Sequence, residues 1–242
     1  MWKWMVFLLF ATSVLTTCGS KEKVYRIGID TSWYPLRLMG KEANLCAFTK
    51  DLLLEMSQEE GVSFEKVVVN WENLLFGLKE RHYDGVLTSI APSAHMRDIY
   101  EFSEPILYSG LILIIRSDSK EKSNNLTGKR IATTSPRDET LLLKRYPGAI
   151  SCNYSSIAES LKALVTNDID AIIADRFLAL RHIHNLYQEK VEITSSSLDS
   201  LGLYLITLQG KNKKLTEIFN QGLKKMHNNG TYDRLLKKWK LK

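Results

Sequence analysis

Short apolar runs alternate with amphipathic stretches along almost the whole chain. An apolar run of about four to eight residues predicts a strand, whereas apolar residues spaced three and four apart predict a helix. By the first pattern, strands are expected at 24–29, 64–69, 85–88, 111–115, 130–133, 149–152, 170–174 and 201–208. By the second, helices are expected at 48–60, 71–80, 136–145, 157–165 and 176–187, followed by two basic helices that reach Lys242.

The order of these elements predicts the fold class. Strands that alternate with helices of roughly 10–15 residues are typical of parallel sheets covered on both faces. Two such cycles lie on either side of the long apolar strand at 111–115, which favours two α/β lobes over one continuous sheet. Two helix starts are well marked, because Ser156 with Glu159 forms a capping box and Ser135 precedes Pro136 in the first helical turn.

The first seventeen residues have the composition of a targeting signal. Lys3 is followed by an apolar run up to Leu15, which is shorter than the roughly 20 residues that a membrane-spanning helix needs. Residues 1–17 are therefore predicted to be a signal peptide. The sequence LTTCG at its end resembles a bacterial lipobox, so Cys18 is expected to carry a lipid and residues 18–23 to form a tether. The alternative is a plain signal peptide with an incidental cysteine.

The composition of the whole chain is that of a globular protein. The 242 residues are 44% hydrophobic and 25% charged, which excludes disordered, collagen-like and disulfide-framework proteins. The formal net charge is +6, and ten basic residues against two acidic ones lie between Lys211 and Lys242. The excess charge thus belongs to the two terminal helices, where a charged outer face is ordinary. A nucleic-acid partner therefore loses its main support, whereas a basic flank against anionic lipid stays open as an interpretation.

The sequence lacks the motifs of a metal site, a cofactor site or a covalent catalyst. Cys46 and Cys152 stand apart, without a Cys-x-x-Cys spacing. His182 and His184 are two residues apart on a predicted helix, where their side chains point in different directions. Gly-x-Ser-x-Gly, Walker and His-Glu-x-x-His patterns are missing. We therefore expect a non-enzymatic protein without a metal or a cofactor.

Polar residues follow strands in both predicted lobes. Asp30 and Ser89 come after strands of the first lobe, and Ser135 and Asp175 come after strands of the second. In an open parallel sheet, ligands bind beyond the carboxyl ends of the strands. These four positions therefore predict a cleft that grips a small polar molecule from both sides. Each has a structural alternative, because aspartate and serine often cap the turns and helices that follow, and the nearby Trp33 could belong to the core.

Seven short motifs occur along the chain in a characteristic order. They are IGIDTSWYP at 27–35, WENL at 71–74, YDGV at 83–86, FSEP at 102–105, LTGKRIA at 126–132, DIDAIIAD at 168–175, and GTYD at 230–233 with Trp239. Through them the chain, from Val24 to its C-terminus, resembles the periplasmic solute-binding proteins of family 3. These serve polar amino-acid ABC transporters of the glutamine, arginine and histidine type. Each motif is weak alone, whereas the ordered set is specific.

The resemblance implies a type II periplasmic binding protein, in which two Rossmann-like α/β lobes are joined by a two-strand hinge. The first lobe would comprise residues 24–108 and 203–242, and the second residues 109–202, with crossings near 106–110 and 198–202. The implied function is capture of a polar amino acid, glutamine or a basic one, and its delivery to an ABC permease with its ATPase. The protein is expected to be a monomeric, membrane-anchored lipoprotein in the periplasm or on the cell surface.

The resemblance also assigns roles to individual residues. By analogy, Trp33 would stack over the ligand, Asp30 would meet its side chain and Asp175 would bind its α-ammonium group. The half of the site that would hold the ligand carboxylate departs from the family pattern. Ser89 is kept, but Met96 takes the place of the family's arginine.

Two other arginines could replace the missing one. Arg97 directly follows Met96, and Arg137 adds a bidentate donor where Ser135 and Pro136 open a helix whose free N–H groups attract anions. The ligand carboxylate is therefore predicted to be shared between Arg97 and the helix terminus at Arg137. The alternative is that both arginines are solvated and that the ligand is not a standard α-amino acid.

Two other functions are compatible with the same scaffold. The fold also carries a cyclohexadienyl dehydratase, and a fold alone does not determine a function. Such an enzyme needs a positioned acid or base in the cleft, for which Glu42 and His95 are the extra candidates. The other alternative is a sensory or surface lipoprotein that has lost ligand binding, because the carboxylate motifs are altered.

Overall fold

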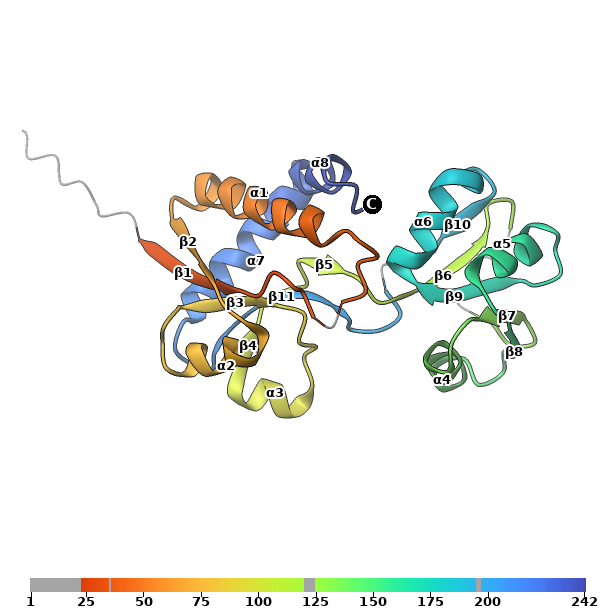
Figure 1. The fold of residues 1–242 in the computed structure, drawn as a ribbon, viewed down its shortest axis with the longest axis horizontal. Coiled ribbons are helices and arrows are strands. Elements are labelled where there is room, and N and C mark those ends of the chain that lie inside the picture. Colours follow the sequence, from red (N-terminus) through yellow and green to blue (C-terminus); the bar gives the residue numbers. More distant parts are fainter. Residues whose placement is uncertain (1–22, 35, 120–124, 195–196) are drawn as a thin grey trace, which may run out of the picture.

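The computed structural model describes residues 23–34, 36–119, 125–194 and 197–242, which form two α/β lobes (Figure 1). The first lobe contains β1 (Val24–Ile29), α1 (Glu42–Glu60), β2 (Ser63–Val68), α2 (Trp71–Lys79), β3 (Gly85–Thr88), α3 (Ala94–Ile99), β4 (Tyr100–Phe102), β5 (Leu107–Tyr108), β11 (Gly202–Leu208), α7 (Lys213–Asn228) and α8 (Thr231–Lys238). The second contains β6 (Leu111–Arg116), β7 (Arg130–Thr133), α4 (Pro136–Arg145), β8 (Ile150–Asn153), α5 (Ile157–Val165), β9 (Ala171–Asp175), α6 (Arg176–Leu186) and β10 (Val191–Ile193).

The predicted signal peptide, the lipid-attachment residue Cys18 and most of the predicted tether lie outside the described residues. Among the helices that the structure describes, none combines the length and the apolar character needed to cross a membrane. The membrane anchor predicted at Cys18 therefore stays a prediction from the sequence.

The first lobe is built around a mixed sheet. Its strands lie in the order β2-β1-β3-β11-β4, and β5 pairs with β11. β1 is parallel to β2 and β3, whereas β11 runs antiparallel to β3, β4 and β5. Helices α1, α7 and α8 cover one face, and α2 and α3 cover the other (Figure 1). The chain thus returns to the first sheet through β11 after it has built the second lobe.

The second lobe has a sheet of its own, in the order β10-β6-β9-β7-β8. β7 is parallel to β8 and β9, whereas β6 is antiparallel to β9 and β10. Successive residues of a strand point to opposite faces, so Ile112 and Ile114 of β6 pack with α5 and α6 while Leu111 and Leu113 pack on the side of α4. The unbroken apolar run of β6 is explained by these helices, which cover both faces of the sheet.

The architecture agrees with the predicted α/β class of two lobes, and most predicted strands and helices are present. The helix predicted from residue 48 already begins at Glu42, and the short elements α3, β4, β5 and β10 were not predicted. The prediction of parallel sheets is wrong in part. β6 and β11 run antiparallel to their neighbours, because they are the strands through which the chain enters the second lobe and returns from it.

Two segments cross between the lobes. The first leads from β5 to β6 through Ser109 and Gly110, and the second leads from Leu198 to β11. They are hydrogen-bonded to one another, because the backbone N–H of Ser109 donates to the carbonyl of Leu201 at 3.1 Å and that of Leu198 donates to the carbonyl of Leu111 at 2.6 Å. The two crossings therefore form one short hinge between the lobes.

The basic terminal helices face an acidic helix. The ion pairs are Lys225–Glu60 (2.8 Å), Arg234–Glu55 (2.6 Å) and Lys238–Asp51 (2.7 Å), and each joins α7 or α8 to α1. The hydrogen bond from Lys238 holds the pKa of Asp51 below its usual value. Part of the positive charge that the sequence assigned to an outer face is therefore neutralised within the first lobe.

Candidate functional site

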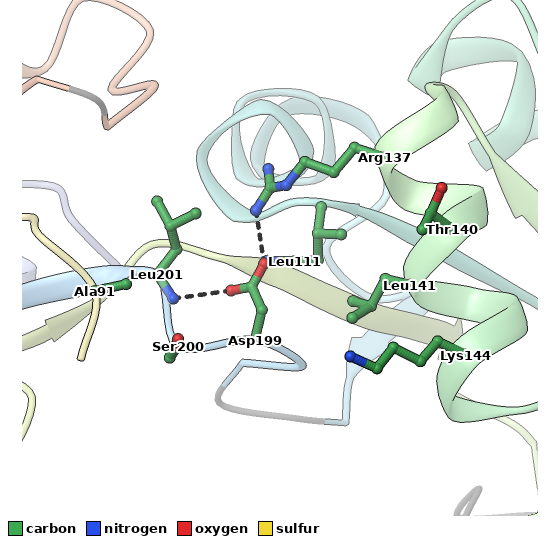
Figure 2. A pocket seen from close by; sticks show the side chains of 9 residues that line it. All are labelled: Ala91, Leu111, Arg137, Thr140, Leu141, Lys144, Asp199, Ser200 and Leu201. Atoms are coloured by element: carbon green, nitrogen blue, oxygen red, sulfur yellow. Dashed lines mark hydrogen bonds and ion pairs between the residues drawn. The ribbon is translucent and has the colours of Figure 1, made fainter. Parts of the chain in front are cut away.

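A hollow of about 400 Å³ lies where the second lobe meets the hinge. Its lining residues are Ala91, Leu111, Arg137, Thr140, Leu141, Lys144, Asp199, Ser200 and Leu201 (Figure 2). Ala91 follows β3 of the first lobe, residues 199–201 belong to the second crossing, and Arg137 and Lys144 come from α4 of the second lobe. The hollow therefore receives side chains from both lobes and from the hinge, and its volume suits a small molecule.

Helix α4 presents a polar side to the hollow. The hydroxyl of Ser135 caps this helix, because it accepts a hydrogen bond from the backbone N–H of Asp138 at 3.2 Å. Arg137, Leu141 and Lys144 follow one another at four and three residues, so they lie on one side of the helix. Leu142 points away from that side and is buried in the core. The amphipathic pattern of α4 thus fixes which of its basic residues face the hinge.

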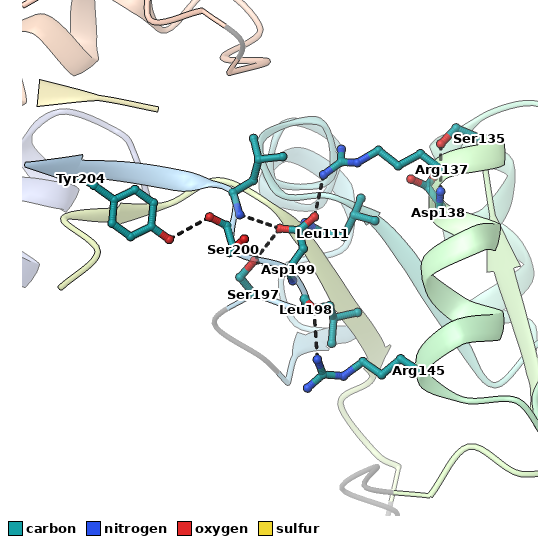
Figure 3. A network of polar contacts seen from close by, with 11 residues as sticks. Leu111, Ser135, Arg137, Asp138, Arg145, Ser197, Leu198, Asp199, Ser200 and Tyr204 are labelled. Carbon is teal, nitrogen blue, oxygen red and sulfur yellow. Dashed lines mark hydrogen bonds and ion pairs between the residues drawn. The ribbon is translucent and has the colours of Figure 1, made fainter. Parts of the chain in front are cut away.

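A short ion pair joins this helix to the hinge (Figure 3). Nη2 of Arg137 lies 2.6 Å from Oδ2 of Asp199, and the two side chains are 41% and 19% exposed. The other oxygen of Asp199 accepts hydrogen bonds from the backbone N–H of Leu201 at 3.1 Å and from the hydroxyl of Ser197 at 3.2 Å. A Cβ on Gly110 would lie 1.7 Å from this same oxygen. Glycine is therefore required at position 110 for the carboxylate to reach the other crossing.

Asp175 ends β9 and is half-buried beside the hinge. Its Oδ1 accepts hydrogen bonds from the backbone N–H groups of Phe177 at 3.1 Å and Leu178 at 3.3 Å, so it caps α6. Burial raises the pKa of Asp175, whereas these two N–H groups and the positive charges of Arg137 and Arg37 oppose the shift. Asp175 is therefore a carboxyl within electrostatic reach of one arginine from each lobe.

Asp30 and Ser89 follow β1 and β3, at the edge of the first sheet. Asp30 accepts hydrogen bonds from the backbone N–H of Ser32 at 3.2 Å and from its hydroxyl at 2.5 Å. Ser89 is buried and donates its hydroxyl to the backbone carbonyl of Tyr34 at 2.5 Å. Asp30 therefore caps the turn that follows it, which is its structural alternative, whereas Ser89 holds the loop after β1 from the neighbouring strand. Contact of either with a ligand stays a prediction.

Trp33 lies in the core of the first lobe. Its side chain is 2% exposed, and its Nε1 donates to the sulfur of Cys46 at 3.2 Å. The prediction that Trp33 stacks over a ligand is therefore wrong for this structure, because the ring is covered by the loop and by α1. Its neighbour Tyr34 is 59% exposed and meets the ring of Trp71 edge-on at 5.2 Å between centroids. The aromatic surface next to Asp30 thus belongs to Tyr34 and Trp71.

Arg97 is not among the residues that line the hollow. It is exposed on α3, with its guanidinium carbon 5.7 Å from the centre of the Phe102 ring. Burial raises the pKa of Tyr204 to about 12, and the charge of Arg97 opposes that shift. The hydroxyl of Tyr204 donates to the carbonyl of Ser200 at 2.8 Å, and Ser200 lines the hollow. Arg97 therefore lies on the first-lobe side of the hinge, and a carboxylate shared with Arg137 stays a prediction.

Sequence reasoning missed four polar residues of the hollow and one basic residue whose charge acts on Asp175. They are Thr140, Lys144, Asp199 and Ser200, and Arg37. Helical spacing could have found Lys144, because it lies seven residues after Arg137. The segment of Asp199 was predicted to cross between the lobes, but its pairing with α4 depends on how the crossing turns. Arg37 lies in a loop, for which periodicity gives no direction.

The described part of the chain contains no group of three or more His, Cys, Asp or Glu residues that could hold a metal ion. Cys46 in α1 and Cys152 in β8 are free thiols in different lobes. The polar groups around the hollow are instead one aspartate, one arginine, one lysine and hydroxyl groups. These groups bind charged organic molecules through hydrogen bonds and ion pairs.

Comparison with known sequences gives consistent matches over nearly the whole chain. A model of the bacterial extracellular solute-binding proteins, family 3, matches residues 25–242. The "Probable histidine-binding protein" of Campylobacter jejuni is 26% identical over 218 residues, which cover 89% of this chain and 84% of that protein. The arginine-binding extracellular protein of Bacillus subtilis is 22% identical over 252 residues, which cover 98% of this chain and 97% of that protein.

Comparison with solved structures shows the same two-lobed fold. The L-cystine solute receptor of Neisseria gonorrhoeae in its unliganded open conformation matches with a TM-score of 0.64 at 21% identity, over 90% of this chain and 93% of that one. An ancestral cyclohexadienyl dehydratase matches with a TM-score of 0.64 at 18% identity, over 89% of this chain and 92% of that one. At such low identity these matches show the fold alone.

Proposed function

Because the chain belongs to family 3 of the bacterial extracellular solute-binding proteins, we propose that it binds a polar amino acid between its lobes and delivers it to an ABC permease with its ATPase. Its relatives named as histidine-binding and arginine-binding proteins support this ligand class. The finer assignment, to glutamine or a basic amino acid, rests on Asp30, whose carboxylate accepts hydrogen bonds from amide and charged N–H groups. The protein would act as a monomer, held to the membrane by a lipid on Cys18.

The observation that carries this proposal is the presence of opposite charges beside the hinge, with Asp175 at the end of β9 and Arg137 in α4. An amino acid bears an ammonium and a carboxylate on one carbon, so its site needs an anion and a cation close together. Asp175 would accept hydrogen bonds from the ammonium, and the fork of the Arg137 guanidinium would bind the carboxylate. Burial raises the pKa of Asp175, and the positive charge of Arg137 is one of the influences that oppose this shift. Both residues belong to the second lobe, which would hold the ligand first.

The first lobe would complete the site by closing over it. The loop after β1 carries the exposed side chains of Tyr34 and Arg37, and Arg37 already influences the pKa of Asp175 across the hinge. Rotation about the two crossings would bring this loop onto the ligand and bury it. A ligand that contacts both lobes favours the closed form, because only that form makes both sets of contacts. The closed form would be what the permease recognises.

An enzyme on the same scaffold is the second candidate, because the fold matches that of a dehydratase. Glu42 begins α1 and His95 is exposed on α3, and neither lines the hollow. Asp199 does line it, but its carboxylate is held by Arg137. Incubation with prephenate-like acids, followed by detection of the decarboxylated product, separates the two functions. Turnover would overturn the binding proposal.

A thermal-shift screen of the twenty amino acids tests the proposed function. We expect at least one polar amino acid to raise the unfolding temperature, because a ligand that binds only the folded state stabilises it. At 100 times Kd the gain is about 2.7 kcal/mol, which corresponds to a shift of roughly 5–10 °C for a chain of this size. If no amino acid shifts the transition, the surface or sensory alternative replaces transport.

Amino-acid binding should weaken on acidification at a higher pH than for an ordinary aspartate. Burial raises the pKa of Asp175, and an ammonium group is held only by the ionised carboxylate. As the pH falls through this raised pKa, the carboxyl gains a proton and the attraction is lost, whereas affinity is constant above it. Calorimetric Kd values between about pH 4 and 8 would show the transition.

The control for this pH profile is Asp175→Asn, which carries no titratable group at the same position. Its affinity should be lower than that of the wild type and flat over the same pH range. If the variant shows the wild-type profile, another group titrates and the assignment of Asp175 is wrong.

A further inference from the structure

Resting on the proposed function, we propose that Asp199 competes with the ligand carboxylate for Arg137 and thereby sets the affinity of the site. Asp199 belongs to the hinge and has no part in the binding scheme described above. Its carboxylate presents to Arg137 the same chemical group that an amino acid would bring. Exchange of one carboxylate for the other would couple ligand binding to the hinge.

The ion pair already has the geometry of a bound carboxylate. Nη2 of Arg137 and Oδ2 of Asp199 are 2.6 Å apart, at the short end of charge-assisted hydrogen bonds. Both side chains line the hollow, and the guanidinium reaches across it from α4 to the crossing (Figure 2). Within the described residues, Asp199 is the only hydrogen-bonding or ion-pair partner of this guanidinium. The guanidinium of Arg137 is therefore occupied by a carboxylate of the protein itself.

Hydrogen bonds hold the Asp199 side chain in place, so Arg137 is the side that would move if it exchanged Asp199 for a ligand carboxylate. The aspartate accepts hydrogen bonds from the N–H of Leu201, the hydroxyl of Ser197 and the N–H of Leu111, at 3.1, 3.2 and 3.5 Å. Arg137 has four further N–H donors and a long side chain that is 41% exposed. A ligand carboxylate can thus approach donors that Asp199 leaves unused, and then draw the guanidinium away from the hinge.

The negative charge of Asp199 opposes that approach. Two carboxylates beside one guanidinium repel one another, and Asp199 cancels much of the positive charge that would attract the second. Partial exposure of the pair limits the effect through solvent screening. Removal of the charge of Asp199, with its shape kept, should therefore strengthen binding of a carboxylate at Arg137 by roughly tenfold.

The ion pair between Arg137 and Asp199 also ties the second crossing to the second lobe. Next to Asp199, the carbonyl of Leu198 accepts from Nη1 of Arg145 at 3.1 Å, and the carbonyl of Ser200 accepts from the hydroxyl of Tyr204 at 2.8 Å (Figure 3). The crossing is thus held to α4 on one side and to β11 on the other. Release of Arg137 would remove one of the two arginine contacts that the described residues make between α4 and the crossing, and would thereby weaken the hold of the second lobe on the hinge.

A double-mutant cycle measures the competition. Asp199→Asn, Arg137→Gln and the double variant are titrated by calorimetry with the amino acid selected by the screen, starting with L-glutamine and L-arginine. Asp199→Asn should lower Kd roughly tenfold, Arg137→Gln should raise it, and the double variant should match Arg137→Gln, because the competition acts through Arg137. Unchanged or weaker binding by Asp199→Asn, or a gain that persists without Arg137, would overturn the proposal.

The matched control is Glu55→Gln. It breaks the Arg234–Glu55 pair, which is equally short at 2.6 Å but joins α8 to α1 on the first lobe. Its Kd should equal that of the wild type. A tenfold gain in this control would show that any lost carboxylate strengthens binding, and would contradict a specific role for Asp199.

A readout without amino acid separates this proposal from the proposed function. Phenylglyoxal modifies accessible arginines, and peptide mass spectrometry gives the rate at each site. Arg137 should react several-fold faster in Asp199→Asn than in the wild type, whereas the exposed Arg181 on α6 should react equally in both. Equal rates at Arg137 would overturn the proposal even if amino acids bind. A faster rate without binding of any amino acid would confirm that Asp199 shields Arg137 and would refute the proposed function.

A second labelling experiment needs no variant and so does not depend on whether Asp199→Asn folds. In the wild type, salt screens a partly exposed ion pair. The rate at Arg137, relative to that at Arg181, should therefore rise between low and high sodium chloride concentration. A ratio independent of salt would contradict the proposal that Asp199 shields Arg137.

Discussion

Replacing Asp175 by asparagine is expected to weaken amino-acid binding by roughly 30-fold or more. Loss of one member of a buried, hydrogen-bonded charge pair costs about 2 kcal/mol or more, and about 1.4 kcal/mol corresponds to a factor of ten. The helix cap should survive, because Oδ1 can still accept from the N–H groups of Phe177 and Leu178 and asparagine caps helices as well as aspartate. Calorimetry on the folded variant therefore isolates the charge.

Asp170, at the other end of strand β9, supplies the control. Asp170 directly precedes β9, whereas Asp175 ends it, so the two carboxylates lie at opposite ends of the strand. Asp170 accepts from the backbone N–H of Arg130 at 2.7 Å and does not line the hollow. Asp170→Asn should change stability slightly and leave Kd unchanged. Equal losses of affinity in both variants would show that the effect comes from the strand and would contradict an ammonium site at Asp175.

Replacing Phe177 by alanine should lower the free energy of unfolding by about 3–5 kcal/mol, the usual cost of a fully buried phenylalanine. Phe177 lies in α6 of the second lobe but is 0% exposed and belongs to the core of the first lobe. The Nζ atom of Lys41, at the start of α1, lies 5.8 Å from the centre of its ring. The ring therefore joins the lobes beside Asp175. Urea unfolding followed by circular dichroism measures the loss.

Phe76→Ala is the matched control, because it removes the same side chain at an exposed position. Phe76 lies in α2 of the first lobe and is 59% exposed, so Phe76→Ala should change stability by less than about 0.5 kcal/mol. A loss at Phe177 as small as this would contradict the packing described, because it would mean that the ring is already solvated in solution. Amino-acid affinity should also fall in Phe177→Ala, since Asp175 is only two residues away.

The sequence predicted the positions of Asp30, Ser89, Ser135 and Asp175 at strand ends, and the structure places each of them there. The local hydrogen bonds of Asp30, Ser135 and Asp175 could be expected too, because capping depends on residues only two or three positions away. The bond of Ser89 to Tyr34 could not, because it joins residues 55 positions apart. The orientation of the Trp33 side chain could not be predicted in this way. Two adjacent aromatic residues in a loop can exchange the buried and the exposed position, and the packing against α1 put Trp33 inside and Tyr34 outside.

The charge of the C-terminal segment could likewise be predicted from the sequence, whereas its ion-pair partners could not. The excess of lysine and arginine near the C-terminus can be counted in the sequence. Its effect depends on Asp51, Glu55 and Glu60, which are more than 160 residues away in α1 and pair with α7 and α8. The sequence therefore overestimated the positive charge of this outer face, because acidic residues of α1 pair with it in the fold.

By itself, the sequence determined the alternation of strands and helices, the division into two lobes and the helix that carries Arg137. These follow from periodicity and capping, which act over a few residues. Only the tertiary structure decided that Asp199 of the hinge pairs with Arg137, 62 residues away along the chain. It also decided that the charge of Arg37 in one lobe acts on the pKa of Asp175 in the other. Both interactions depend on how the two crossings place the lobes.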